Sequence, residues 1–264
     1  MATATPSDAS ASTRIVKLRI KRQDGPGKPV RWETFDVPVE PGANVISCLQ
    51  WIAENPVTTD GKQTTPVVWD ANCLEEVCGA CTMNINGSVR QSCSCLIDEY
   101  APNNNDMITL EPMTKYPVVR DLWVDRARIF ETLKTVSAWV PIDSTYDLGP
   151  GPKAIPDGQQ VRYKISECMS CGCCMEACPQ YLIENQFVGA SPIAQVRLFN
   201  AHDTGKVLKE ARLDALMGPG GIDDCGNAQN CVKACPKEIP LTEAIASIGR
   251  QMTIHGVRKF FMGR

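Results

Sequence analysis

The residues of this chain most able to do chemistry are its fourteen cysteines, eleven of which fall into three spaced groups. The first group reads Cys73-x4-Cys78-x2-Cys81, and a further cysteine follows downstream at Cys93 or Cys95. This is the plant-type spacing of [2Fe-2S] ligands, in which thiolates of one tight loop wrap one side of a cluster. Spacing alone leaves Cys93 and Cys95 open as the fourth ligand.

The other two groups are copies of one motif. Residues 168–179 read CMSCGCCMEACP and residues 225–236 read CGNAQNCVKACP, so the second copy has Ala228 where the first has Cys171. In ferredoxins with two clusters, the last cysteine of such a run binds the cluster of the other run. This crossing rule predicts a [4Fe-4S] cluster on four thiolates and a [3Fe-4S] cluster on three: Cys168, Cys171, Cys174 and Cys235 for the former, and Cys178, Cys225 and Cys231 for the latter.

Three cysteines remain outside these sets, and we interpret each as a packed thiol: Cys48, Cys173 and, if Cys93 is the ligand, Cys95. The alternative from another functional class is a structural module that binds zinc. Zinc knuckles usually pair two short cysteine units, whereas here three cysteines crowd one loop and the later groups repeat in register. The sequence therefore favours iron–sulfur clusters over zinc.

Composition excludes several other functions. The net charge is −3, which predicts no general attraction to nucleic acid. Residues 1–13 lack the charged and apolar regions of a secretory signal, so we expect a disordered tail and reduced thiols. No apolar run approaches the roughly 18 residues of a membrane span. His202 and His255 are isolated, and no nucleophile–base pair or nucleotide-binding loop accompanies the cysteines. We therefore expect a chain that carries electrons and leaves substrate chemistry to a partner.

The elements that must position the cysteines follow from hydrophobic periodicity. Residues 14–22 and 30–39 alternate like two strands of a hairpin, and 44–55 have one apolar helical face. A second hairpin is predicted in TMNINGSVRQ, with Asn86-Gly87 at its turn. The N-terminal part is thus expected to mix helix and strand.

The C-terminal part reads as mostly helical. Apolar spacing predicts a helix over 118–136, and Gly and Pro predict a loop or linker over 140–160. Residues 241–252 are predicted to be helical, with Thr242 as a candidate N-cap.

The sequence resembles the iron–sulfur subunits of succinate dehydrogenase and fumarate reductase, from about residue 14 to the C-terminus. Four blocks carry the resemblance, in family order and spacing: TPVVWDANCLEEVCGACTMNING, YPVVRDLWVDRARIFE, CMSCGCCMEACP and CGNAQNCVKACPKEIPLTEAI. EEVCGAC and WVPIDSTYDLGPGP resemble the menaquinone-linked bacterial branch in particular. The resemblance favours Cys93 as the fourth ligand of the first group, so that the [2Fe-2S] set would be Cys73, Cys78, Cys81 and Cys93.

The resemblance implies an α+β chain in two domains. A β-grasp [2Fe-2S] ferredoxin domain would cover 14–115, and a helical two-cluster ferredoxin domain would cover 116–264. Electrons from succinate would pass from the FAD of a flavoprotein subunit through [2Fe-2S], [4Fe-4S] and [3Fe-4S] clusters to a quinone in a transmembrane anchor. In the menaquinone-linked branch this quinone would be menaquinone. The subunit would lie peripherally on the cytoplasmic face of a bacterial membrane. A fumarate reductase running in reverse would use the same chain of clusters.

One feature departs from the family pattern, and one segment has two possible interpretations. Ubiquinone-linked relatives have a Trp and a His at the positions of Ile183 and Gly226, so two side chains of the usual quinone pocket are absent. The segment RQMTIHGVRKFFMGR either contacts the anchor or lipid headgroups or ends as a surface helix with packed phenylalanines.

The reduction potential of a plant-type [2Fe-2S] centre lies near roughly −400 mV. Hydrogen bonds and burial must therefore raise the potential of the first centre before succinate can reduce it.

Overall fold

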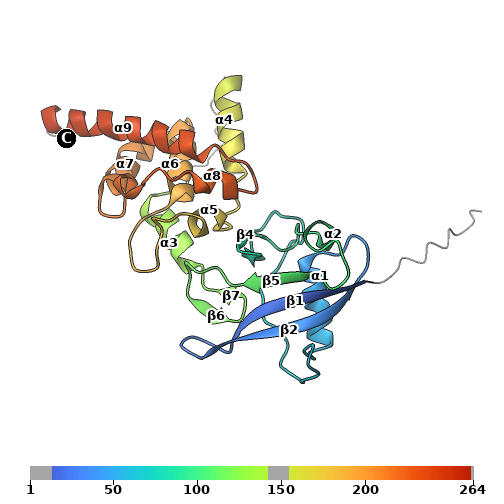
Figure 1. Cartoon of the computed structure of the whole chain (residues 1–264). Helices are drawn as coiled ribbons and strands as arrows, with labels where there is room; N and C mark the ends of the chain where they lie inside the picture. Colours follow the sequence, from blue (N-terminus) through green and yellow to red (C-terminus); the bar gives the residue numbers. More distant parts are fainter. Residues whose placement is uncertain (1–13, 142–154, 263–264) are drawn as a thin grey trace, which may run out of the picture.

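A computed structural model describes residues 14–141 and 155–262 of the chain. The first part is built on a five-stranded sheet in the order β2-β1-β5-β3-β4, in which β1 and β5 are parallel and the other neighbours are antiparallel (Figure 1). The strands are β1 (Arg14–Gln23), β2 (Val30–Val39), β3 (Thr82–Ile85), β4 (Ser88–Gln91) and β5 (Met107–Glu111). Helices α1 (Val45–Glu54) and α2 (Ile97–Tyr100) complete this part.

The predicted hairpins and the first helix are confirmed. β1 pairs with β2 over their full lengths, and their alternate side chains, such as Leu18 and Phe35, are completely buried. Asn86 and Gly87 both have left-handed φ angles, 50° and 77°, as a tight hairpin turn requires. Asn44 and Ser47 form a capping box at the start of α1, which fixes where the helix begins.

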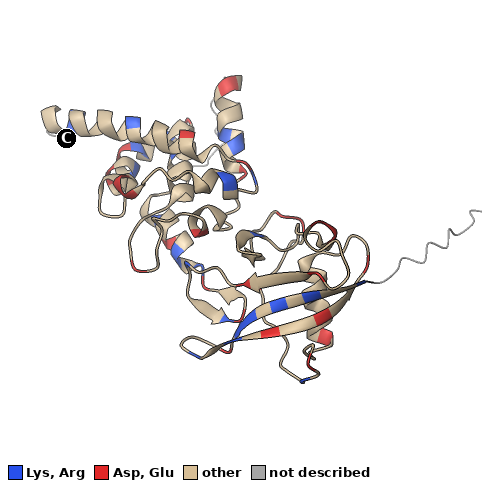
Figure 2. Cartoon of the chain, in the orientation of Figure 1, with Lys and Arg blue, Asp and Glu red and all other residues tan. Residues whose placement is uncertain are grey.

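The outer face of the first hairpin carries charge in pairs. Figure 2 shows basic residues along β1 beside acidic residues of β2. Lys17 and Asp36 lie 2.7 Å apart across the two strands. Such half-exposed pairs contribute little free energy, but opposite charges across a strand pair favour the observed register.

The second part is helical. It contains α3 (Ala127–Thr135), α4 (Pro156–Ser166), α5 (Cys173–Glu176), α6 (Ala190–Ala201), α7 (Lys209–Met217), α8 (Asn230–Ala234) and α9 (Leu241–Met262), with short 3-10 turns η1 (Gly205–Leu208) and η2 (Ile222–Asp224). Their apolar faces form a second core around residues such as Ile193, Leu216 and Ile248. The cysteine copies lie around α5 and α8, the two short helices that contact each other.

The helix predicted over 118–136 is wrong in its first half. Residues 118–124 form a small hairpin, β6 (Val118–Arg120) and β7 (Trp123–Val124), and α3 begins only at Ala127. The reason is Asp121, which is fully buried with a left-handed φ of 48°. Its carboxylate accepts from Arg22 Nε at 2.9 Å and from the backbone N–H groups of Gln23 and Val68 at 3.0 Å each. These tertiary bonds hold the chain against the sheet and override the helical spacing.

Two further expectations need correction. The loop predicted over 140–160 lies mostly outside the described residues, but its end is helical because α4 begins at Pro156, where a proline fits the first turn. Thr242 is not an N-cap. The helix α9 begins at Leu241, and the carbonyl of Pro240 accepts the N–H of Ala244 at 3.0 Å, so Thr242 lies within the first turn.

The segment between the two parts belongs to both. Leu122 packs in the core of the sheet, whereas Met113 and Tyr116 pack in the helical core. A cut between residues 115 and 116 therefore falls inside a shared segment.

Candidate metal centres

The loop of the first cysteine group directs backbone N–H groups at sulfur. Cys73 Sγ accepts from Glu75, Val77 and Cys78 at 3.3–3.4 Å. These bonds stabilise a thiolate and lower the pKa of Cys73 to about 7. Left-handed φ angles at Leu74 (61°), Glu76 and Gly79 turn the loop so that these donors point inward.

The fourth position of this group is distinguished by its contacts. Cys93 Sγ accepts the backbone N–H of Glu76 at 3.3 Å, so Cys93 faces the loop. Cys95 is buried in the core of the sheet domain, and burial raises the pKa of its thiol to about 11. Cys48 lies in the same core, where burial raises its pKa to about 12. The structure thus brings Cys93 to the loop and places Cys48 and Cys95 as packed thiols.

The second group is assembled from both motif copies. Desolvation raises the pKa of Cys174 well above the usual value, and the neighbouring thiols of Cys171, Cys168 and Cys235 raise it further. Burial likewise raises the pKa of Cys235, and its thiol neighbours are again Cys171 and Cys168. Four thiolates close together in a buried site would repel one another and lose their hydration. They can therefore all be deprotonated only when a cationic centre binds them.

The third group lines a small pocket. The residues that line it include Cys178, Cys225, Cys231 and Ala228. Burial raises the pKa of Cys231, with smaller contributions from the thiols of Cys178 and Cys225. The last cysteine of each copy therefore lies near cysteines of the other copy, as the crossing rule requires: Cys178 lies near Cys225 and Cys231, and Cys235 lies near Cys168 and Cys171.

The cysteine groups suit clusters better than single ions. Within residues 14–141 and 155–262, no three His, Cys, Asp or Glu side chains converge closely enough to hold one metal ion. Ligands of an iron–sulfur cluster surround several atoms, so their sulfurs stand further apart than zinc ligands do. The donor set fits as well, because N–H groups directed at sulfur are the hydrogen bonds that such clusters receive.

The first and second groups meet at a close contact between the two parts of the chain. Gly79 has a φ of 71°, and a Cβ on it would lie 2.7 Å from the Cα of Cys171. The carbonyl of Gly79 accepts from Arg126 Nη1 and from Thr82 Oγ1. Only glycine allows this approach, so the residue next to Cys78 is fixed by the neighbouring group.

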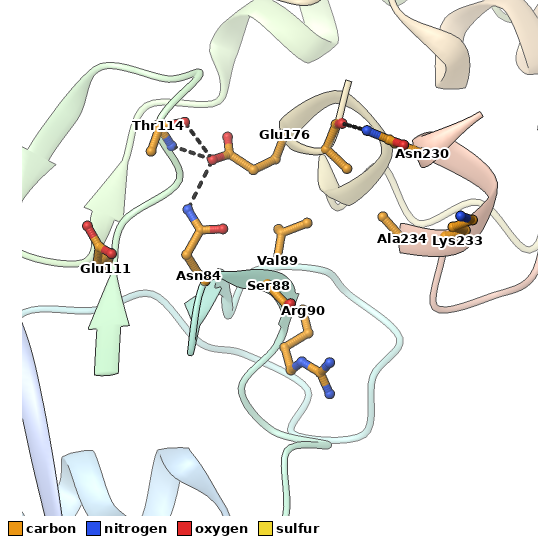
Figure 3. A pocket seen from close by; sticks show the side chains of 12 residues that line it. Asn84, Ser88, Val89, Arg90, Glu111, Thr114, Glu176, Asn230, Lys233 and Ala234 are labelled. Atoms are coloured by element: carbon orange, nitrogen blue, oxygen red, sulfur yellow. Dashed lines mark hydrogen bonds between the residues drawn. The ribbon is translucent and has the colours of Figure 1, made fainter. Parts of the chain in front are cut away.

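Sequence reasoning missed a buried carboxylate that joins the two parts. Glu176, on α5, accepts from Asn84 Nδ2 at 3.0 Å and from the backbone N–H groups of Thr114 (2.7 Å) and Lys115 (3.0 Å). Figure 3 shows the bonds from Asn84 and Thr114 to Glu176, beside an open pocket lined by residues of β3, β4 and α8. A lone Glu between two motif cysteines gave no signal for this role.

The two histidines and Asp70, which precedes the first cysteine loop, have structural partners. His202 Nδ1 accepts from the backbone of Thr204 and Gly205, and His255 pairs with Asp214 at 2.8 Å. Asp70 pairs with Arg126 at 3.5 Å. None of these lies in a cysteine group.

Of the two positions that depart from the ubiquinone-linked pattern, Gly226 follows Cys225 of the third group, whereas Ile183 lines a different pocket, with Tyr116 and Val118. Ile183 is half exposed. A Cβ on Gly226 would lie 2.5 Å from Gln180 Nε2, so the Gln180 side chain fills the space beside this glycine.

The C-terminal segment continues α9 to Met262, and its phenylalanines are not packed. Phe260 is 81% exposed and Phe261 79% exposed, which contradicts the alternative of packed phenylalanines for the chain by itself. Every helix in the described ranges is too short or too polar to span a membrane.

These features define an iron–sulfur electron-transfer protein of the ferredoxin type. A family model for a 2Fe-2S iron-sulfur cluster binding domain matches residues 17–131, and one for a 4Fe-4S dicluster domain matches residues 164–239. The chain is 52% identical to the succinate dehydrogenase iron-sulfur subunit of Bacillus subtilis over 248 residues, which cover 94% of this chain and 96% of the relative. The chain therefore belongs to the family of succinate dehydrogenase iron–sulfur subunits.

Two further comparisons agree. The fumarate reductase iron-sulfur subunit of Wolinella succinogenes is 28% identical over 244 residues, 90% of this chain and 98% of the relative. A chain of the Mycobacterium smegmatis Sdh1 complex in the apo form superposes with a TM-score of 0.73 at 22% identity, over 91% of this chain and 96% of that chain. That likeness shows the fold, a ferredoxin-type domain followed by a helical dicluster domain.

Proposed function

We propose that this chain conducts electrons within a membrane-bound succinate:quinone oxidoreductase, from a FAD-bearing flavoprotein subunit to quinone in a transmembrane anchor. When bound, the iron–sulfur clusters supply one-electron redox centres. The single observation that carries the proposal is that three separate cysteine groups lie in one chain, with the first two in contact through Gly79 and Cys171. The family and the 52% identity to a succinate dehydrogenase subunit support succinate as the electron source.

The ligand sets follow from the crossing rule and the contacts. We assign Cys73, Cys78, Cys81 and Cys93 to [2Fe-2S], Cys168, Cys171, Cys174 and Cys235 to [4Fe-4S], and Cys178, Cys225 and Cys231 to [3Fe-4S]. The chain's own residues bury five of these cysteines and leave the other six partly buried, and the first loop directs backbone N–H donors at sulfur. The domain boundary is proposed at residues 115/116, within the segment shared by both cores.

Exposed apolar side chains support the two partners. Leu74 and Val77, on the first cysteine loop, are 48% and 61% exposed, which suits the docking of a flavoprotein over the [2Fe-2S] site. At the other end, Phe260 and Phe261 offer an apolar surface to the anchor. This arrangement supports a role as a peripheral subunit. The resemblance to the menaquinone-linked bacterial branch supports a position on the cytoplasmic face of a bacterial membrane, with menaquinone as acceptor.

Metal analysis and EPR of the purified complex test the proposal. The three clusters together hold about nine iron atoms and about ten acid-labile sulfides per chain. EPR of the oxidised and then the reduced complex is expected to show three distinct centres. A colourless protein that contains zinc and no sulfide would overturn the assignment.

The ligand set of the first centre has a matched test in neighbouring cysteines. Cys93→Ser is expected to remove or strongly alter the [2Fe-2S] signal, whereas Cys95→Ser leaves it unchanged, because only Cys93 faces the loop. Loss of the signal in the Cys95 variant alone would reverse the assignment. Activity assays in both directions with a menaquinol analogue distinguish succinate oxidation from fumarate reduction, which the same chain of clusters could serve.

A further inference from the structure

One buried amide lies between the first and second cysteine groups. Gln91 is the last residue of β4, and none of its surface is exposed. Its Oε1 accepts from Cys81 Sγ at 3.5 Å, and its Nε2 donates to Cys173 Sγ at 3.5 Å and to Thr82 Oγ1 at 2.7 Å. Cys81 belongs to the first group, and Cys173 stands between two cysteines of the second.

Binding of iron to Cys81 changes what this amide must do. A metal-bound thiolate has no proton, so it accepts hydrogen bonds and cannot donate one. With its oxygen toward such a sulfur, Gln91 would place two acceptors face to face in a dry site. Rotation of the amide by 180° exchanges its oxygen and nitrogen without changing the shape of the side chain. The rotated amide gives Cys81 an N–H donor.

The neighbours of Gln91 can accommodate the rotated amide. Cys173 lies outside the ligand sets and keeps its S–H. This group is within hydrogen-bond reach of Cys171, and it can turn from there to donate to the amide oxygen. The hydroxyl of Thr82 donates to the carbonyl of Gly79 at 2.8 Å, and this carbonyl also accepts from Arg126. The hydroxyl can therefore turn to the amide oxygen while Gly79 retains a donor.

We propose that Gln91 is a positioning residue for electron transfer: its amide donates to the iron-bound Cys81 sulfur, is held in that orientation by Cys173, and raises the reduction potential of the first centre. A hydrogen bond to a cluster sulfur stabilises the reduced, more negative state, which raises the potential. The inference rests on the proposed function, and it gives Cys173, the cysteine outside the motif register, a role in the chain of centres.

The test is an EPR-monitored redox titration of the whole complex with substituted Gln91. Gln91→Leu removes the donor at nearly the same volume, and the midpoint potential of the first centre is expected to fall. Gln91→Glu replaces the donor with an acceptor and adds negative charge, so the potential falls further. Cys173→Ala removes the group that orients the amide, and a smaller fall is expected.

A matched control is Cys48→Ala, which removes a buried thiol of α1 that neighbours Cys95; the potential is expected to stay unchanged. An unaltered first-centre potential in Gln91→Leu, with iron and sulfide at wild-type content, overturns the inference. The wild-type complex provides a second readout if Gln91→Leu fails to assemble: with glutamine labelled by 15N in its side chain, pulsed EPR of the reduced first centre is expected to show coupling to that nitrogen, and no coupling overturns the inference. Absence of the first-centre signal in wild type would instead refute the proposed function.

Discussion

At the scale of single residues, we propose that Ala228 sets the composition of the third centre. It stands in the second copy where the first has Cys171, and it lines the same pocket as Cys178, Cys225 and Cys231. Ala228→Cys supplies a fourth thiolate, so we expect about one more iron atom per chain, loss of the three-iron EPR signal of the oxidised complex, and a lower potential at this centre.

The control for this substitution is Ala228→Ser, which adds a polar atom of similar size without a thiolate. It is expected to keep the three-iron signal. If the oxidised wild-type complex shows no such signal, the explanation of Ala228 fails at once.

Gly79 provides a second prediction, on stability. Its left-handed φ and its contact with Cys171 both exclude a side chain, whereas Gly87 has a similar φ of 77° and nothing within 4 Å of its Cβ position. A left-handed conformation costs an alanine about 1–2 kcal/mol at either site. Gly79→Ala is therefore expected to lower the free energy of unfolding by more than Gly87→Ala, as measured by denaturant titration. Equal losses would show that the seam yields easily to a methyl group.

Site residues that recur at fixed intervals in a motif could be predicted from the sequence. Residues whose role depends on contacts with distant parts of the chain could not. The cysteine groups are visible because iron–sulfur ligands recur at fixed intervals. Gln91 and Glu176 are chemically ordinary in the sequence. Their roles depend on Cys173 and Asn84, which lie 82 and 92 positions away along the chain.

At the scale of elements, local periodicity predicted the hairpins and α1 because turn residues and caps close them within a few positions. The parallel pairing of β1 with β5 joins segments about ninety residues apart, and no local signal indicates it. The helix over 118–136 was predicted too long for the related reason that Asp121 binds Arg22, a contact across 99 positions. Tertiary hydrogen bonds outweigh helical spacing wherever a buried charge must be satisfied.

The short helix α5 gives a prediction at this scale. It has only four residues, so its position depends on Glu176 and the donors across the seam. Glu176→Ala leaves those buried donors unpaired and is expected to lower the free energy of unfolding by about 1–3 kcal/mol. Glu176→Gln keeps the oxygen that accepts from Asn84 and Thr114 and loses the acceptor for Lys115, so a smaller loss is expected.

Glu111 is the matched control, because it lines the same pocket. Its ion pair with Lys21 is partly exposed, and such pairs contribute about 0–1 kcal/mol. Thermal and denaturant unfolding of Glu111→Gln is expected to match wild type closely. A loss as large as that of Glu176→Ala would mean that the pocket rim, and not the seam, limits stability.

At the scale of the whole molecule, the sheet lies on one side and the C-terminal end of α9 lies on the opposite side (Figure 1). The first cysteine group belongs to the sheet end, and the third lies in the helical part beside α8 and α9. Electrons that enter at the first group therefore approach the helical end as they pass from group to group. The apolar end of α9 is then the natural place for the acceptor side of the complex.

The phenylalanines of α9 test that arrangement. Burial of one phenylalanine against the anchor contributes about 1.5–3 kcal/mol, so Phe260→Ser with Phe261→Ser is expected to weaken membrane retention at least tenfold, on the scale where about 1.4 kcal/mol is a factor of ten. Phe130→Ser is the matched control, because Phe130 is 52% exposed on α3 and its loss is expected to leave retention unchanged. Fractionation of membranes measures retention, and EPR of the released subunit is expected to show all centres, because neither phenylalanine packs on a cysteine group. Full retention of the double variant would mean that the anchor binds the chain elsewhere and that the exposed end of α9 is an ordinary helix terminus.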